Sequence, residues 1–124
     1  MNRTIVLAAC ILAIAIAVAL PCSAQDMATT AGDQAKVVLE NEKVRVIQLE
    51  IAPGAKTGMH SHGDNVVVFL TGGDAVQALP DGSTSERHSE AGEVFWSGPV
   101  THDTTNMGQV ATKVLVIELK DPAE

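Results

Sequence analysis

The chain has 124 residues, carries a net charge of −7 at neutral pH and contains only eight lysine and arginine residues. An acidic chain without a basic cluster is a poor match for nucleic acid or anionic lipid, which are bound through lysine- and arginine-rich surfaces. Both cysteines, Cys10 and Cys22, precede residue 25, so neither disulfide nor thiolate chemistry is expected beyond that point. This length suits one domain with one core.

Residues 1–24 have the pattern of a cleavable secretory signal peptide. Arg3 gives a positive start, residues 5–20 are apolar, and residues 22–24 place small side chains before the expected cut. The apolar run is shorter than the roughly 20 residues of a spanning helix, so an uncleaved membrane anchor is the weaker alternative. A lipidated cysteine also fits the spacing poorly. We therefore expect a periplasmic or secreted protein with no stable membrane insertion after cleavage.

Beyond the leader, the sequence divides into three parts. Residues 25–36 are small and polar without periodicity, which predicts a flexible lead-in. Residues 37–120 form the predicted domain, and residues 121–124 are a tail.

The domain is predicted to consist of strands almost throughout. The expected strands are residues 37–40, 43–51, 60–62, 65–71, 75–79, 84–90, 93–96, 102–106 and 110–119. The run 84–90 is polar and is expected to face solvent, whereas Phe69 and Phe95 are assigned to the core. No segment shows a sustained helical period, and turn signals recur roughly every 8–12 residues. This pattern predicts an all-β sandwich or barrel.

Three histidines are the candidate metal ligands. Side chains two apart on a strand point to the same face, so His60 and His62 are aimed into one space. Imidazole is the commonest metal ligand in proteins, and His102, at the head of another strand, can supply the third nitrogen. The alternative for any single buried histidine is a hydrogen-bonded structural role. His88 lies beside Arg87 on the polar strand and is expected on the surface.

The spacing of these residues resembles the two sequence motifs of the cupin superfamily. The first motif, Gly-x5-His-x-His-x3-Glu-x6-Gly, is matched at Gly54, His60, His62 and Gly73, with Val66 in place of the glutamate. In a second motif, shortened by one residue, Gly92, His102 and Asn106 match, whereas Gly98 and Val100 replace its proline and glycine. The resemblance covers residues 37–120 and implies a cupin-type double-stranded β-helix, a jelly-roll barrel. It also implies a divalent metal held inside the barrel by His60, His62 and His102.

The family's fourth ligand is a glutamate, and Val66, which stands in its place, cannot coordinate a metal. Asp64 has the parity of the histidines but follows a strand-breaking glycine, and Asp103 should point to the opposite face. Asn106 could reach inward, but a carboxamide is a weak ligand for a transition metal. The sequence therefore predicts a three-histidine facial site with its remaining coordination positions open.

Several residues are candidates for the surroundings of this site. Thr104, Gln48 and Gln77 are candidates to accept hydrogen bonds from the outward ring nitrogens. Trp96, the only tryptophan, can either wall the pocket or lie in the core or at the rim.

The resemblance implies a metal-dependent enzyme that acts on a small molecule, with oxygenase-type chemistry, because three-histidine cupins resemble non-haem iron dioxygenases. Fe, Mn, Zn, Ni and Cu all remain open as the metal. A non-catalytic module that binds a metal or small ligand, and a scaffold with vestigial histidines, are the alternatives. Small cupins often extend a sheet across two subunits, so a homodimer through residues 37–40 is also expected.

Overall fold

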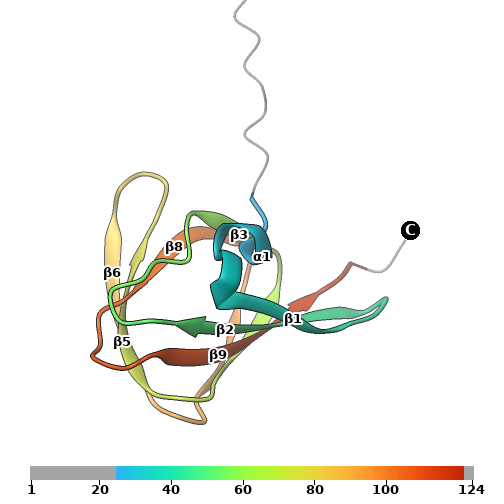
Figure 1. The fold of residues 1–124 in the computed structure, drawn as a ribbon. Coiled ribbons are helices and arrows are strands. Elements are labelled where there is room, and N and C mark those ends of the chain that lie inside the picture. The colour runs from blue at the N-terminus through green and yellow to red at the C-terminus, as the bar shows by residue number, and fades with distance from the viewer. Residues whose placement is uncertain (1–24, 122–124) are drawn as a thin grey trace, which may run out of the picture.

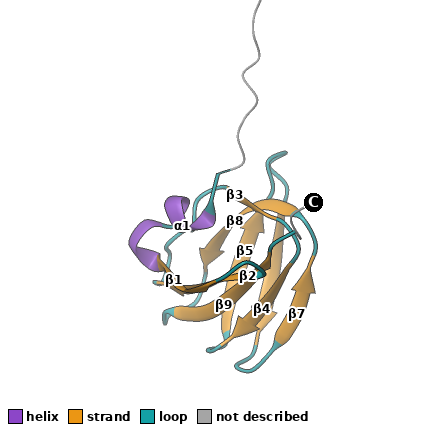
Figure 2. Cartoon of the chain, turned by 90° about the vertical axis from the view of Figure 1, so that its right-hand side faces the viewer, coloured by secondary structure: helices purple, strands orange, loops and turns teal. Residues whose placement is uncertain are grey.

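The computed structural model describes residues 25–121, which contain two antiparallel sheets (Figures 1 and 2). Residues of both sheets line a cavity. The elements are α1 (Met27–Thr30), a 3-10 turn η1 (Gly32–Gln34), β1 (Ala35–Glu40), β2 (Val44–Ile51), β3 (His60–His62), β4 (Asn65–Phe69), β5 (Gly73–Ala78), β6 (Thr84–Ser89), β7 (Val94–Ser97), β8 (Val100–Asn106) and β9 (Thr112–Leu119). The signal peptide predicted for residues 1–24 and most of the tail lie outside the described residues. Within that range, neither helical segment has the length and apolar character needed to traverse a bilayer.

The strand order identifies the architecture. One sheet runs β1-β2-β9-β4-β7 and the other runs β3-β8-β5-β6. Only β1–β2 and β5–β6 pair with their neighbours in sequence, so most connections carry the chain from one sheet to the other. Alternation between two facing sheets is the pattern of a jelly roll. The all-β, jelly-roll prediction is confirmed.

The core lies on the inner face of the larger sheet. Ile47, Leu49 and Ile51 of β2 are buried together with Val114 and Val116 of β9. These strands pair in continuous antiparallel register, and every second side chain points inward. The apolar alternation of the sequence therefore fixes which face of each strand forms the wall of the cavity.

The segment 25–36 is folded against the barrel, so the predicted flexible lead-in is corrected. Met27 and Ala31, four residues apart on one helical turn, are 1% and 4% exposed and belong to the core. The Asp26 carboxylate binds the guanidinium of Arg45. Figure 1 shows α1 lying beside β3. A single turn of helix is too short to give a periodic signal, which explains why sequence alone suggested a loop.

The outer edge of the larger sheet is formed by β1, which begins before the predicted boundary at residue 37. Its side chains Val37, Val38 and Leu39 are exposed. An apolar edge strand has unpaired backbone groups available for pairing with another chain. Dimerisation through this edge stays a prediction.

Candidate metal centre

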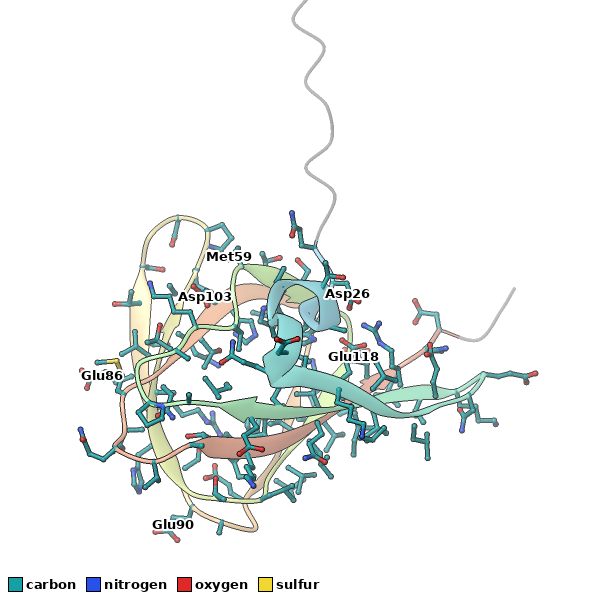
Figure 3. All side chains as sticks on the ribbon, in the orientation of Figure 1. Asp26, Met59, Glu86, Glu90, Asp103 and Glu118 are labelled. Carbon is teal, nitrogen blue, oxygen red and sulfur yellow. The ribbon has the colours of Figure 1, made fainter. Side chains whose placement is uncertain are left out.

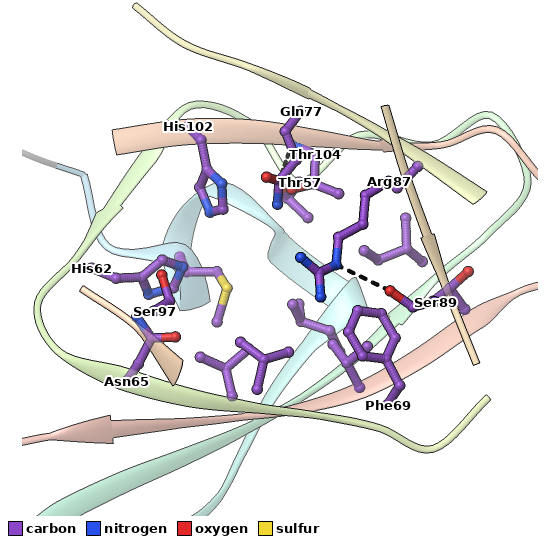
Figure 4. A pocket seen from close by; sticks show the side chains of 18 of the residues that line it. Thr57, His62, Asn65, Phe69, Gln77, Arg87, Ser89, Ser97, His102 and Thr104 are labelled. Carbon is purple, nitrogen blue, oxygen red and sulfur yellow. Dashed lines mark hydrogen bonds between the residues drawn. The ribbon is translucent and has the colours of Figure 1, made fainter. Parts of the chain in front are cut away.

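Pairing between β3 and β8 brings the three histidines together. His102 stands directly opposite His60 in the antiparallel register, and directly opposed residues point to the same face. His60 is 2% exposed and His62 is also buried. One ring nitrogen of each residue lies within 4.8 Å of the others, and the ring centroids are 4.7–5.5 Å apart. Figure 4 shows His62 and His102 at one end of the cavity.

The outward ring nitrogens of the two β3 histidines both donate hydrogen bonds. His60 Nδ1 lies 2.6 Å from the carbonyl oxygen of Gly58, and His62 Nδ1 lies 2.9 Å from Glu118 Oε1. A carbonyl or an ionised carboxylate can only accept, so each Nδ1 carries the proton. Each Nε2 is left with a lone pair directed toward the cavity.

These two Nε2 atoms face each other at 2.9 Å. Two lone pairs at that separation repel unless a proton or a cation lies between them. Burial lowers the pKa of His60, and burial together with the neighbouring histidines lowers the pKa of His102 to about 4. Protonation of His60 and of His102 is therefore disfavoured at neutral pH, whereas a divalent cation about 2.0–2.1 Å from each nitrogen satisfies the lone pairs. The residues present fit a metal ion.

A carboxylate stands behind His62 in place of the predicted hydrogen-bond acceptors. Glu118 Oε2 accepts a 2.7 Å hydrogen bond from Arg45 Nε, while Oε1 accepts from His62. Among the described residues, Thr104, Gln48 and Gln77 make no hydrogen bond to a histidine ring, so that prediction was wrong. Carboxylate–histidine pairs of this kind fix the tautomer and raise the basicity of a metal-binding imidazole.

Glu118 is ionised in this environment. Burial acts to raise its pKa, but the hydrogen bonds from His62 and Arg45 and the charge of Arg45 outweigh it, so the pKa of Glu118 is lowered. Arg45 is held at its other end by Asp26 (Figure 3 shows Asp26 and Glu118 on the same side of the barrel). The chain Asp26–Arg45–Glu118 therefore fixes the orientation of His62 from outside the cavity.

A sequence signal for this network exists. Arg45 and Glu118 are cross-strand partners, and both have the inward parity of the core residues on β2 and β9. Charged residues that continue an inward-facing apolar series are unusual unless they are paired. The pair itself follows only from the register of two strands far apart in sequence.

Asp103 faces away from the cavity, as predicted, and positions His60 indirectly. Its Oδ1 accepts hydrogen bonds from Gly58 N at 2.9 Å and from Thr57 Oγ1 at 3.3 Å. Gly58 has φ of 77°, and a Cβ there would lie 3.1 Å from Thr30 Cβ. This close approach requires glycine at the residue whose carbonyl sets the tautomer of His60.

Val66, which stands at the position of the motif's glutamate, does not line the cavity. Its neighbours Asn65 and Val67 do. Asp64 is also outside the lining, and Asn106 is structural, because its amide nitrogen donates at 2.8 Å to each of two backbone carbonyls. No aspartate or glutamate among residues 25–121 lines the cavity, so its walls offer no carboxylate beside the three histidines.

The cavity extends from the histidines to Arg87 on β6 and has a volume of about 140 Å³. Phe69 and Phe95, assigned to the core, form part of its wall and stack at 5.9 Å. The prediction that 84–90 faces solvent is only partly right, since Arg87 and Ser89 turn inward (Figure 4).

Two further expectations concern the surface. His88 is exposed, as predicted, and its Nδ1 lies 2.6 Å from Asp74 Oδ1. Trp96 is exposed and does not line the cavity, so it lies on the outer surface of β7.

Comparison with known proteins agrees with this architecture. No family model matches the sequence. The chain is 37% identical over 86 residues to the β-alanine degradation protein BauB of Pseudomonas aeruginosa, spanning 66% of this chain and 85% of that protein. A crystal structure of a cupin domain from Bordetella pertussis Tohama I is 29% identical with a TM-score of 0.66, covering 70% of this chain and 92% of that one.

A second crystal structure supports the fold alone. The RmlC-like cupin with a double-stranded β-helix fold from Methanocaldococcus jannaschii is 12% identical with a TM-score of 0.57, covering 71% of this chain and 80% of that one. Strand topology, inward histidines and these similarities agree. The chain belongs to the cupin superfamily.

Proposed function

We propose that this cupin binds one divalent metal through His60, His62 and His102 and acts on a small molecule inside the barrel. The observation that carries the proposal is the pair of Nε2 lone pairs facing each other at 2.9 Å, with both outward nitrogens committed as donors. Imidazole ligands suit several divalent transition metals, so Fe, Mn, Zn, Ni and Cu are all candidates.

The ligand set determines the electrostatics of the site. When bound, the metal would supply Lewis-acid or redox chemistry. Three neutral imidazoles leave its full charge in place, which favours anionic ligands at the remaining positions. The apolar walls, including Val67, Phe69 and Val116, reduce the access of bulk water. Glu118 keeps the proton on His62 Nδ1 and thereby keeps Nε2 available.

Oxygenase-like turnover is the catalytic form of this proposal. Its support is the resemblance of three-histidine cupins to non-haem iron dioxygenases, together with a relative whose name assigns it to β-alanine degradation. The alternative is a non-catalytic barrel that holds a metal or small ligand. We also propose export, on the leader-like pattern of residues 1–24.

Metal content tests the first part of the proposal. Purified protein should contain about one divalent metal per chain after loading and desalting, and His60→Ala should lose it, because two imidazoles bind a divalent ion far more weakly than three. His88→Ala is the matched control, since His88 is an exposed histidine outside the cavity. Elemental analysis gives the stoichiometry. Equal metal content in His60→Ala and the unmodified protein would contradict the site.

The carboxylate behind His62 makes a separate prediction. Glu118→Gln keeps an oxygen opposite Nδ1 but removes the charge, and should weaken metal affinity roughly ten- to a hundredfold. Glu40→Gln, which removes an exposed carboxylate paired with Lys120, should leave the affinity unchanged. Competition with a chromophoric chelator measures both. An affinity for Glu118→Gln within twofold of the unmodified protein contradicts the role assigned to Glu118.

Oxygen uptake separates an enzyme from a binding module. The protein is first loaded with iron in the absence of oxygen and is then mixed with air-saturated buffer that contains small acids or thiols. The unmodified protein should consume dioxygen in this assay, and His102→Ala should not. An oxygen electrode follows the reaction, with iron-free protein as the control. Stoichiometric iron without uptake across the screen would contradict the oxygenase form and favour the binding module.

A further inference from the structure

The charge of the cavity is opposite in sign to the charge of the chain. Arg87 is the only charged side chain among the described residues that line it, and no acidic or lysine side chain is present there. The whole chain carries −7. If the histidines hold a divalent cation, as proposed above, positive charge stands at both ends of the cavity. A small anion is the ligand that such an interior would select.

Arg87 is held in a fixed orientation. Its Cζ lies 3.8 Å from the ring centroid of Phe95, in the geometry of a cation–π contact. Nε donates to Ser89 Oγ at 3.1 Å, and Nη2 donates to Glu93 Oε1 at 3.0 Å. Ser89 is buried. A guanidinium fixed in this way loses little conformational freedom when it binds a ligand.

The guanidinium retains binding capacity. Within residues 25–121, Nη1 has no hydrogen-bond partner, and Figure 4 shows the guanidinium reaching into the cavity. The side chain of Glu93 is 38% exposed, so its ion pair with Arg87 is screened by solvent and compensates the charge only partly. Carboxylate and phosphate both match the geometry of the arginine fork, and a carboxylate is the smaller of the two.

The strand register indicates the size of the ligand. Arg87 pairs with Ala75, which pairs with Asn106, so Arg87 is level with a point four residues along β8 from His102. At about 3.3 Å per residue this is roughly 13 Å between the backbone positions, and the side chains of arginine and histidine occupy much of it. The remaining space, within a cavity of about 140 Å³, suits a molecule of only a few carbon atoms.

We propose that the cavity binds a short-chain carboxylic acid, with its carboxylate on Arg87 and its other end toward the histidine centre. The contact between the ligand and a metal at the histidines rests on the proposed function, whereas the contact between its carboxylate and Arg87 does not. The competing explanation is that Arg87 only braces Phe95 and Glu93, in which case removing its charge would lower stability without selecting between acids and neutral analogues.

The test is an NMR titration of zinc-loaded and zinc-free protein with acetate, propionate, 3-hydroxypropionate and the neutral propionamide. Propionate should bind at least about tenfold more tightly than propionamide, because the amide lacks the charge that the guanidinium pairs with. Arg87→Gln should weaken propionate roughly ten- to a hundredfold and leave propionamide unchanged. Lys113→Gln, which removes an exposed cation outside the cavity, should change neither by more than about twofold.

Zinc content and circular dichroism are measured on every sample. Arg87→Lys, which keeps the charge but not the fork, serves if Arg87→Gln does not fold, and should show an intermediate affinity. Equal affinity for acid and amide, unchanged propionate binding in Arg87→Gln, or no binding of any acid would each overturn the proposal. If the protein takes up no zinc but binds propionate in a way that depends on Arg87, the result would support the carboxylate site and contradict the metal site. A failure of the carboxylate proposal can therefore be distinguished from a failure of the metal proposal.

Discussion

The placement of two protons determines what the histidine cluster can bind. Gly58 and Glu118 each accept a hydrogen bond from an outward ring nitrogen, and this commits the inward nitrogens of His60 and His62 to lone pairs. The register between β3 and β8 adds His102 to the same space. A buried group of neutral imidazoles with converging lone pairs is unfavourable by itself and favourable around a cation. Under the proposed function, the arrangement that binds the cation also lowers the stability of the cluster without it, a trade-off common at functional sites.

The glutamate of the cupin motif has no counterpart in the cavity lining, and a carboxylate instead contacts His62 from behind. Val67 occupies the inward position on β4, and the carboxylate is that of Glu118. Arg45 and Asp26 fix that carboxylate, and the pKa of Arg45 is raised by its hydrogen bonds to Asp26 and Glu118. A charge behind a ligand tunes the imidazole without neutralising the metal. Among residues 25–121, no anionic side chain lines the cavity, and Arg87 is paired only with Glu93, which lies outside the lining.

The strands and the shared face of His60 and His62 could be predicted from local alternation, whereas the jelly-roll topology followed from the resemblance to the cupin motifs, which also placed His102 with the other two histidines. His60 and His62 share a face in any strand, and the paired core residues of β2 and β9 alternate as strands do. The partners of the histidines could not be predicted in this way, since Arg45 and Glu118 meet across a sequence separation of 73 residues. The inward face of a polar strand could not be predicted either. Arg87 and Ser89 turn inward on β6, where every residue is polar and alternation therefore does not distinguish the two faces.

The most direct test of this account is X-ray absorption spectroscopy of the zinc- or cobalt-loaded protein. The account predicts a first shell with three imidazole nitrogens at about 2.0–2.1 Å, falling to two in His102→Ala. Outer-shell scattering characteristic of imidazole rings should diminish in the same proportion. A shell made only of oxygen atoms, or one unchanged by His102→Ala, would show that the histidines do not hold the ion and would contradict the central claim.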